Sequence, residues 1–168
     1  SLRIVLAMSS DGSQIALGDG DGFVRRWRIV AAAPFLEAGA TFRAFEGRVN
    51  DLAFSPDGGR LGGVGDMPRS QASVRMWDLE TSELRLEKPS AAPGGLNSVA
   101  FSPDGSYLAW GGNESMRKGL LSVWSFAASA MVLDVGPTDI CGVADVAFAP
   151  DSKIIATVGS GRVRLWSL

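Results

Sequence analysis

The fold is decided by the hexapeptide Ala53-Phe54-Ser55-Pro56-Asp57-Gly58, which recurs once unchanged and twice in altered form. The recurrences are Ala7-Met8-Ser9-Ser10-Asp11-Gly12, Ala100-Phe101-Ser102-Pro103-Asp104-Gly105 and Ala147-Phe148-Ala149-Pro150-Asp151-Ser152. Their aspartates lie 46, 47 and 47 residues apart. A regular period of this length indicates a repeat architecture, so the chain of 168 residues is expected to hold four copies of one unit.

Each copy has the pattern of four short antiparallel strands. In the third copy the turn Ser102-Pro103-Asp104-Gly105 joins a strand at 96–101 to a second strand at 106–111. Residues 120–126 and 130–135 supply the third and fourth strands. Stacking such sheets around an axis buries both faces of each, which predicts an all-β propeller. A twisted two-sheet sandwich is the alternative, and the regular period argues against it.

Every copy also carries a tryptophan late in its third strand. These residues are Trp27, Trp77, Trp124 and Trp166. The segment Val74-Arg75-Met76-Trp77-Asp78, together with the Ser-Pro-Asp-Gly turns, resembles the WD40 repeat family. The resemblance implies four WD40-type β-propeller blades, as a partial (open) or assembled propeller. It also implies a structural role for the four tryptophans, which would pack between blades.

The chain departs from the family pattern because it contains no histidine. In the family, a histidine joins a hydrogen-bonded set with an Asp, a Ser or Thr and the Trp. Asp21 matches the position of that Asp and is expected to stabilise the turn 18–22. The residues at this position in the other copies are Gln71, Lys118 and Ser160. Loss of the set should cost about 1 kcal/mol per missing hydrogen bond.

We expect a single β-propeller segment over 1–168, with blades at about 1–47, 48–91, 95–138 and 142–168. The last blade is expected to lack its outer strand. The resemblance implies a ring of more blades, so both ends of this arc would be open. Three readings stay open: part of a larger propeller, pairing with a second copy, or docking onto a different chain. The first is preferred because the chain begins and ends at strands.

Composition excludes several classes of function. The 16 Lys and Arg against 18 Asp and Glu give a net charge of −2, which favours neither nucleic acid nor a membrane surface as partner. Without histidine, the commonest general base and metal ligand are missing, so we expect no enzyme, no metal and no cofactor. The lone Cys141 excludes an intrachain disulfide and fits a cytoplasmic location.

Two segments between second and third strands, 65–71 and 112–119, are predicted as enlarged loops, and the family resemblance implies that they lie on one rim. The candidate partner-binding residues there are Met67, Arg69, Met116, Arg117 and Lys118. A flexible Met beside an Arg suits a protein contact, whereas the alternative is a solvated loop that tolerates insertion. On the opposite rim, Phe35 and Leu36 of the link 30–39 are expected to tuck under the blade. Trp110 lies off the repeat pattern and is expected in the core.

The resulting function hypothesis is a protein–protein interaction scaffold. The alternative is a ligand-sensing or catalytic propeller with a site at the central channel. Polar residues on the innermost strands support that alternative, and a metal bound by Asp51 and Asp145 would favour it. These residues are Asn50, Asp51, Asn97, Ser98 and Asp145. A third possibility is the sensing end of a larger signalling chain.

Overall fold

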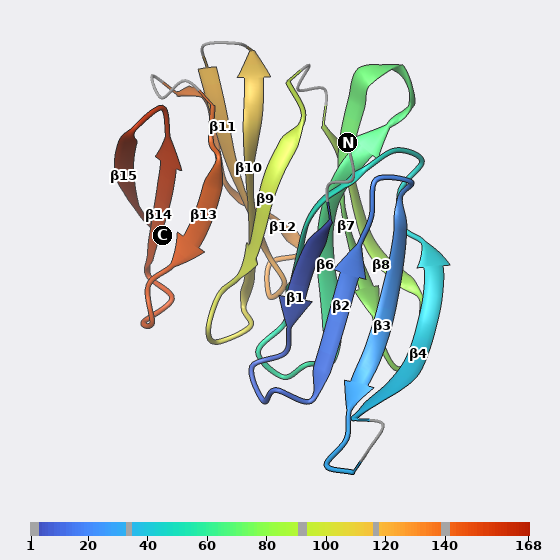
Figure 1. Cartoon of the computed structure of the whole chain (residues 1–168). Coiled ribbons are helices and arrows are strands. Elements are labelled where there is room, and N and C mark those ends of the chain that lie inside the picture. Colours follow the sequence, from blue (N-terminus) through green and yellow to red (C-terminus); the bar gives the residue numbers. More distant parts are fainter. Residues whose placement is uncertain (1–3, 33–34, 91–93, 116–117, 139–141) are drawn as a thin grey trace.

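The computed structural model describes residues 4–32, 35–90, 94–115, 118–138 and 142–168, which form fifteen β-strands and one 3-10 turn (Figure 1). The strands are β1 (Val5–Met8), β2 (Gln14–Gly18), β3 (Phe23–Ile29), β4 (Leu36–Arg43), β5 (Val49–Phe54), β6 (Arg60–Met67), β7 (Gln71–Asp78), β8 (Leu84–Ser90), β9 (Leu96–Phe101), β10 (Tyr107–Ser115), β11 (Lys118–Ser125), β12 (Ala130–Thr138), β13 (Asp145–Phe148), β14 (Ile154–Gly159) and β15 (Arg162–Ser167). Among these residues, no helix is long and apolar enough to cross a membrane.

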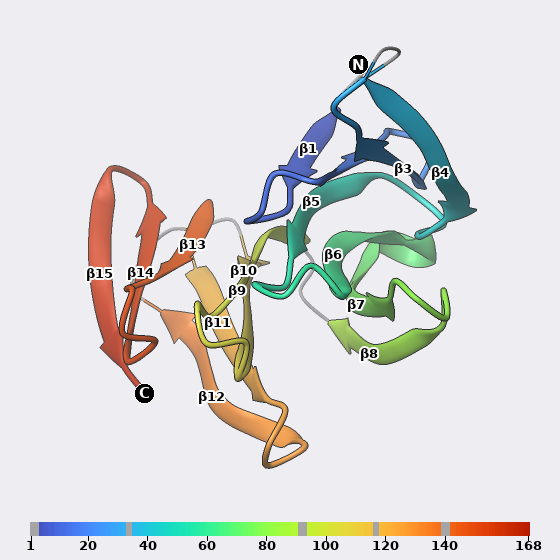
Figure 2. The ribbon, with the colours of Figure 1, turned by 90° about the horizontal axis from the view of Figure 1, so that it is seen from below.

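The strands form four antiparallel sheets, each in chain order. The first three sheets have four strands each, and the fourth consists of β13, β14 and β15. Neighbouring sheets meet through their innermost strands, β1 with β5, β5 with β9 and β9 with β13. Seen along the strands, the sheets stand side by side in an open arc (Figure 2). The all-β architecture of four blade-like sheets is therefore confirmed.

The repeated hexapeptide builds the turn between the first two strands of each sheet. The Ser55 hydroxyl donates to the Asp57 carboxylate, which also accepts the Gly59 amide at 3.0 Å. Gly58 takes a φ of +68°, which glycine adopts without a steric penalty. The same Ser–Asp bond measures 2.6 Å in the first and third copies, as Ser9–Asp11 and Ser102–Asp104. The turn is thus set by local chemistry.

The core consists of three apolar clusters, one at each contact between neighbouring sheets. At the first contact, the Trp77 ring of β7 lies 5.3 Å from the Phe42 ring and 5.8 Å from the Phe45 ring. At the second, the Lys88 ammonium stands 4.2 Å above Trp124. Trp166 packs in the third cluster. In these three sheets the repeat tryptophan faces the preceding sheet.

Trp110 is a core residue, as expected, and is buried in the second cluster. The prediction for Phe35 and Leu36 is wrong, because their side chains are 61% and 45% exposed. The reason is that β4 begins already at Leu36, where it pairs with Ile29 and continues the ladder of β3. The apolar link is therefore shorter than its composition indicated.

The enlarged loop expected at 65–71 is mostly strand. Asp66 pairs with Ala72 and Met67 pairs with Gln71, so β6 and β7 extend to a 3-10 turn at Pro68–Ser70. β10 likewise runs on to Ser115. Gly, Pro and Asp residues indicated a loop here, but cross-strand pairing overrides that preference.

Candidate functional site

Polar side chains line the innermost strands, where the channel site was expected. Asp51, Ser98 and Asp145 hold the same repeat position in the second, third and fourth sheets. The Ser98 hydroxyl donates to Asp145 Oδ1 at 2.8 Å, and the Val99 amide donates to Asp51 Oδ2 at 2.9 Å. Burial raises the pKa of Asp51, and the charge of Asp145 adds to this, although bonds from Val99 and Ser98 oppose it. The hydrogen bonds of these three residues link the second, third and fourth sheets.

Asn50 and Asn97 make the same kind of link one residue earlier. The Asn50 amide nitrogen donates to Asp66 Oδ1 at 2.8 Å and to the Leu96 carbonyl at 3.0 Å. The Asn97 amide nitrogen donates to the Val143 carbonyl at 2.8 Å. Each asparagine thus ties its sheet to the next one in a chain that has no histidine. The five predicted channel residues do come together across sheets, and their polar atoms hold those sheets together.

Within the described part of the chain, no three Asp, Glu, His or Cys side chains are grouped to hold a metal ion. One remnant of the family's hydrogen-bonded set is visible in the fourth sheet. There the Trp166 indole nitrogen donates to the Thr157 hydroxyl at 2.9 Å.

The turn before β3 is organised by Asp19. Its carboxylate accepts the amides of Asp21 and Phe23, both at 3.0 Å, and pairs with Arg25 at 2.6 Å. Burial alone would raise the pKa of Asp19, but these bonds outweigh it and lower the pKa. The structural role expected of the Asp21 carboxylate is thus filled two residues earlier, and Asp21 contributes its backbone amide.

The predicted rim residues are only partly brought together. Met67 is half-buried and packs against the core between the first two sheets. Arg69 is exposed at the hairpin tip with a φ of +61°. Lys118 is exposed at the start of β11. Met116 and Arg117 lie outside the described residues. The β6–β7 and β10–β11 hairpins point to the same end of the arc (Figure 1).

The outward face of the first sheet carries exposed apolar side chains. Leu6 on β1 is 63% exposed, whereas the residues at the same repeat position in the later sheets are 4–5% exposed. Those residues are Leu52, Val99 and Val146. Ile4 and Met8 are exposed as well, at 54% and 55%. The difference arises because each later sheet has a preceding sheet to cover this position and the first has none.

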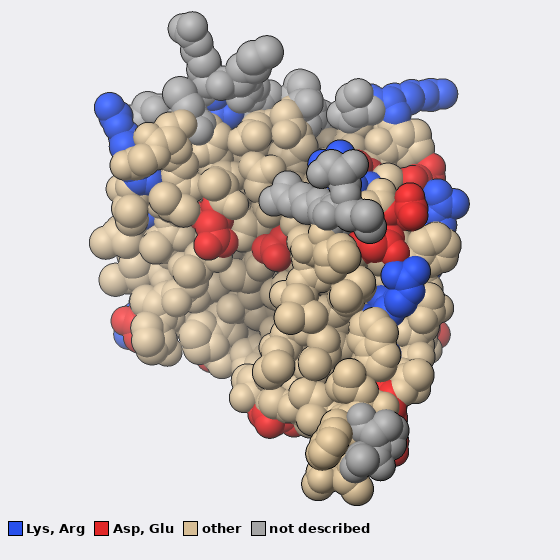
Figure 3. Space-filling view, viewed as in Figure 1, with Lys and Arg blue, Asp and Glu red and all other residues tan. Residues whose placement is uncertain are grey.

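The outward face of the fourth sheet shows the mirror situation. Val163 on β15 is 71% exposed, while its counterparts Val24, Val74 and Leu121 are fully buried. Leu165, two residues on, is 66% exposed. Figure 3 shows a largely uncharged surface over the first and fourth sheets, hollowed between them. We call the two apolar surfaces the end faces: Ile4, Leu6 and Met8 on the first sheet, and Val163 and Leu165 on the fourth.

Sequence reasoning anticipated open ends but did not name the end-face residues. An alignment of the copies would have identified them, because it places Leu6 at the position that Leu52 occupies in the second copy, which is apolar in all four copies. A second missed feature is Arg26, a charged residue where the repeat otherwise has an apolar one before the Trp. Both signals appear when the copies are compared position by position.

Comparison with known proteins agrees with this architecture. The family model described as WD domain, G-beta repeat matches residues 37–78, 87–125 and 134–167, together more than half of the chain. Each match begins on the outer strand of one sheet and ends on the third strand of the next, so one sequence repeat spans two sheets.

Two curated relatives match a shorter stretch. The chain is 40% identical over 57 residues to the guanine nucleotide-exchange factor SEC12 of Rattus norvegicus, and 39% identical over 57 residues to that of Mus musculus. Each match covers 34% of this chain and only 13% of the relative. The family match, by contrast, extends over three repeats. On that evidence the chain belongs to the WD40 repeat family.

Proposed function

We propose that this chain is part of a WD40 interaction scaffold whose end faces pack against further WD40-type blades. WD40 repeats imply a protein-interaction scaffold role. The observation that carries the proposal is the contrast at equal repeat positions: Val163 is 71% exposed, and Val74 is fully buried against the next sheet. Val74 packs on the next blade, so Val163, at the same repeat position of the fourth sheet, is suited to pack on a further blade in the same way.

The hydrophobic effect supplies the driving force. Covering a large apolar side chain stabilises by about 1.5–3 kcal/mol, and each end face presents several such side chains. Both end faces consist of paired strands with apolar residues on alternate positions, which fits sheet-on-sheet packing. In the isolated chain, a second copy is the available source of a further blade.

The rim is proposed as the surface for other proteins. Arg69 and Lys118 are exposed cations on neighbouring hairpins, and arginine is enriched where proteins bind one another. Met116 and Arg117 complete this proposed set. Replacing Arg69 and Lys118 together with alanine should weaken capture of a partner protein, and unchanged capture of every partner would contradict this assignment.

Cysteine cross-linking tests the end faces. Leu6→Cys and Val163→Cys are combined in a Cys141→Ser chain and treated with a short bis-maleimide. We expect head-to-tail dimers and longer products, because the first sheet of one copy covers the fourth sheet of another. The matched control replaces Leu6→Cys with Val132→Cys, since Val132 is an exposed valine on the outer strand β12. Equal cross-linking of both pairs, or none, would contradict the proposal.

A further inference from the structure

Arg26 occupies a position that the repeat reserves for an apolar residue. Its counterparts Met76 and Val123 are 5% and 0% exposed and pack against the next sheet. The register of β3 and β4 shifts between Arg25 and Trp27, and a shift at the same position also occurs in the second and third sheets. A guanidinium therefore takes the place of an apolar side chain at the junction between the first and second sheets, where it reaches the Leu79 carbonyl.

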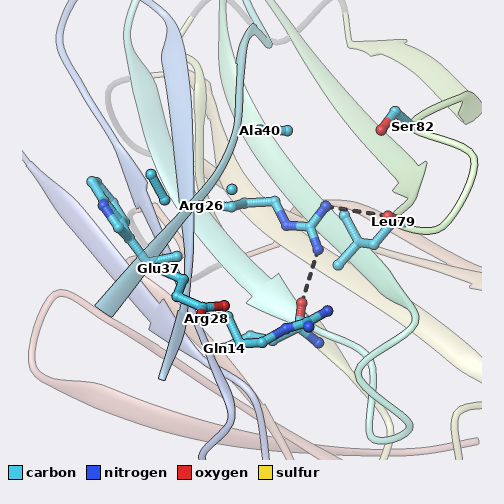
Figure 4. A pocket seen from close by; sticks show the side chains of 10 residues that line it. Gln14, Arg26, Arg28, Glu37, Ala40, Leu79 and Ser82 are labelled. Carbon is cyan, nitrogen blue, oxygen red and sulfur yellow. Dashed lines mark hydrogen bonds between the residues drawn. The ribbon is translucent and has the colours of Figure 1, made fainter. Parts of the chain in front are cut away.

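The two hydrogen bonds of Arg26 both go to neutral acceptors. Its Nη1 donates to the Leu79 carbonyl at 3.3 Å and its Nη2 donates to Gln14 Oε1 at 2.8 Å (Figure 4). Its Nε is buried and is the one buried side-chain polar atom of the described residues that has no hydrogen-bond partner. Burial lowers the pKa of Arg26, and the nearby Arg28 lowers it further. The positive charge is thus held without full compensation.

A second arginine stands beside the first. Arg28 pairs in register with Gln14 on one side and Glu37 on the other. Across the described residues, neither Arg26 nor Arg28 forms an ion pair with a carboxylate. Arg26 is partly buried and Arg28 is exposed. Guanidinium groups without a carboxylate partner can bind a carboxylate or a phosphate through two parallel hydrogen bonds.

These side chains line a pocket of about 360 Å³ that has room for a side chain of another molecule. Gln14, Arg26, Arg28, Glu37, Leu79 and Ser82 are among its walls. An adjoining hollow shares Gln14, both arginines and Leu79, and adds Glu80. We call the 360 Å³ space the Arg26 pocket. Glu37 in this pocket and Glu80 in the adjoining hollow lower the positive potential without forming an ion pair with Arg26.

We propose that the Arg26 pocket binds the anionic side chain of a partner peptide, a carboxylate or a phosphate, through Arg26 and Arg28. The pocket lies beside β4, the edge strand of the first sheet, where residues 36–41 are exposed. An extended peptide can add to such an edge and place one side chain in an adjacent pocket. The proposal rests on the interaction role proposed above and gives it a chemical preference.

Three labelled peptides of one sequence, carrying Glu, phosphoserine or Gln at the central position, test the proposal by fluorescence anisotropy. At low salt, at least one charged peptide should bind about tenfold more tightly than the Gln peptide, because charge-assisted bonds are stronger than neutral ones. The tighter of the two identifies the source of the anion as a carboxylate or a phosphate.

Two variants connect binding to the pocket. Arg26→Met, which copies the residue of the second sheet, should abolish the preference for charged peptides. Glu37→Gln should raise the affinity a few-fold, since it removes a competing carboxylate. Arg28→Gln, on an exposed side chain, provides a second loss variant if Arg26→Met unfolds. Urea unfolding of each variant verifies the fold.

Equal binding of all three peptides, or a charge preference unchanged in Arg26→Met and Arg28→Gln, would overturn the proposal. These variants leave Leu6 and Val163 intact. A failure of end-face cross-linking is therefore distinguishable from a failure of the Arg26 pocket, because each test reads a different surface.

Discussion

The junction between the first and second sheets and the junction between the second and third use the same repeat positions in different ways. At the second junction, Met76 is buried and the Arg60 guanidinium lies 4.5 Å from the centre of the Phe126 ring. At the first junction, the corresponding residues are Arg26, Gln14 and Leu79, which line a pocket. At these positions the second junction is packed, with Arg60 against an aromatic ring, whereas the first junction leaves a pocket open.

The two junctions share one kind of hydrogen bond between sheets. The Gln14 amide nitrogen donates to the Gly58 carbonyl at 3.1 Å, and Arg60 Nη2 donates to the Gly105 carbonyl at 3.3 Å. Each side chain therefore reaches the hexapeptide turn of the following sheet. The difference between the two junctions lies in the volume and charge of these side chains.

The largest loss of stability is expected when a guanidinium is placed at residue 76 in the second junction. Met76→Arg buries a guanidinium among apolar residues, with neither the pocket nor the bond to Gln14 that Arg26 has. We expect a loss of about 3 kcal/mol or more in the free energy of unfolding. Urea denaturation measures it, and Met76→Leu is the matched control because it conserves volume. A loss no larger than that of Met76→Leu would show that both junctions tolerate charge.

Phe126→Leu would give the second junction the residue that the first junction has at this position. The change removes the aromatic partner of Arg60 and its stacking on Phe101, whose ring centre is 6.1 Å away. We expect a loss of about 1–2 kcal/mol, measured by urea denaturation. The reverse change, Leu79→Phe, should fill the Arg26 pocket and weaken peptide binding. Unchanged peptide binding in Leu79→Phe would contradict the claim that the peptide side chain occupies the Arg26 pocket.

Arg26→Met should stabilise the first junction by about 1 kcal/mol, because it removes a buried nitrogen without a partner. The midpoint of urea unfolding should rise at constant slope. Arg28→Met is the control on an exposed side chain and should change the midpoint little. A destabilised Arg26→Met would mean that the guanidinium is well compensated in its pocket.

The smallest expected effect is a change in how stability depends on acidic pH, and it should be equal at both junctions. The hydroxyls of Ser55 and Ser102 hold the pKa values of Asp57 and Asp104 below the ordinary value. The folded chain thus binds fewer protons than the unfolded chain near pH 4, so stability falls as the pH drops through that range. Ser55→Ala and Ser102→Ala should reduce this fall by similar amounts, as measured by urea denaturation at a series of acidic pH values. A fall that is unchanged in either variant would contradict the assignment.

Much of the fold follows from local signals. The period of the hexapeptide and the turn at Asp57 predict the hairpins. The tryptophan in each third strand, such as Trp77, predicts packing between neighbouring sheets. The start of β4 at Leu36 and the extension of β6 to Met67 were missed, because cross-strand pairing decides them. The Arg26 pocket depends on Leu79 and Gln14 meeting across two sheets, which spacing along the chain does not reveal. The charge at Arg26 could nevertheless have been found by aligning the four copies, since the other copies have an apolar residue at this position.

Sedimentation velocity of the 168-residue chain over a wide concentration range tests the central claim most directly. Because the end faces have no neighbour in the isolated chain, we expect self-association that grows with concentration. Val163→Lys should return the chain to a monomer, whereas Val132→Lys, on a valine of the outer strand β12, should leave the association intact. A chain that stays monomeric at every concentration, or association that survives Val163→Lys, would contradict the claim that the end faces are built to pack against further blades.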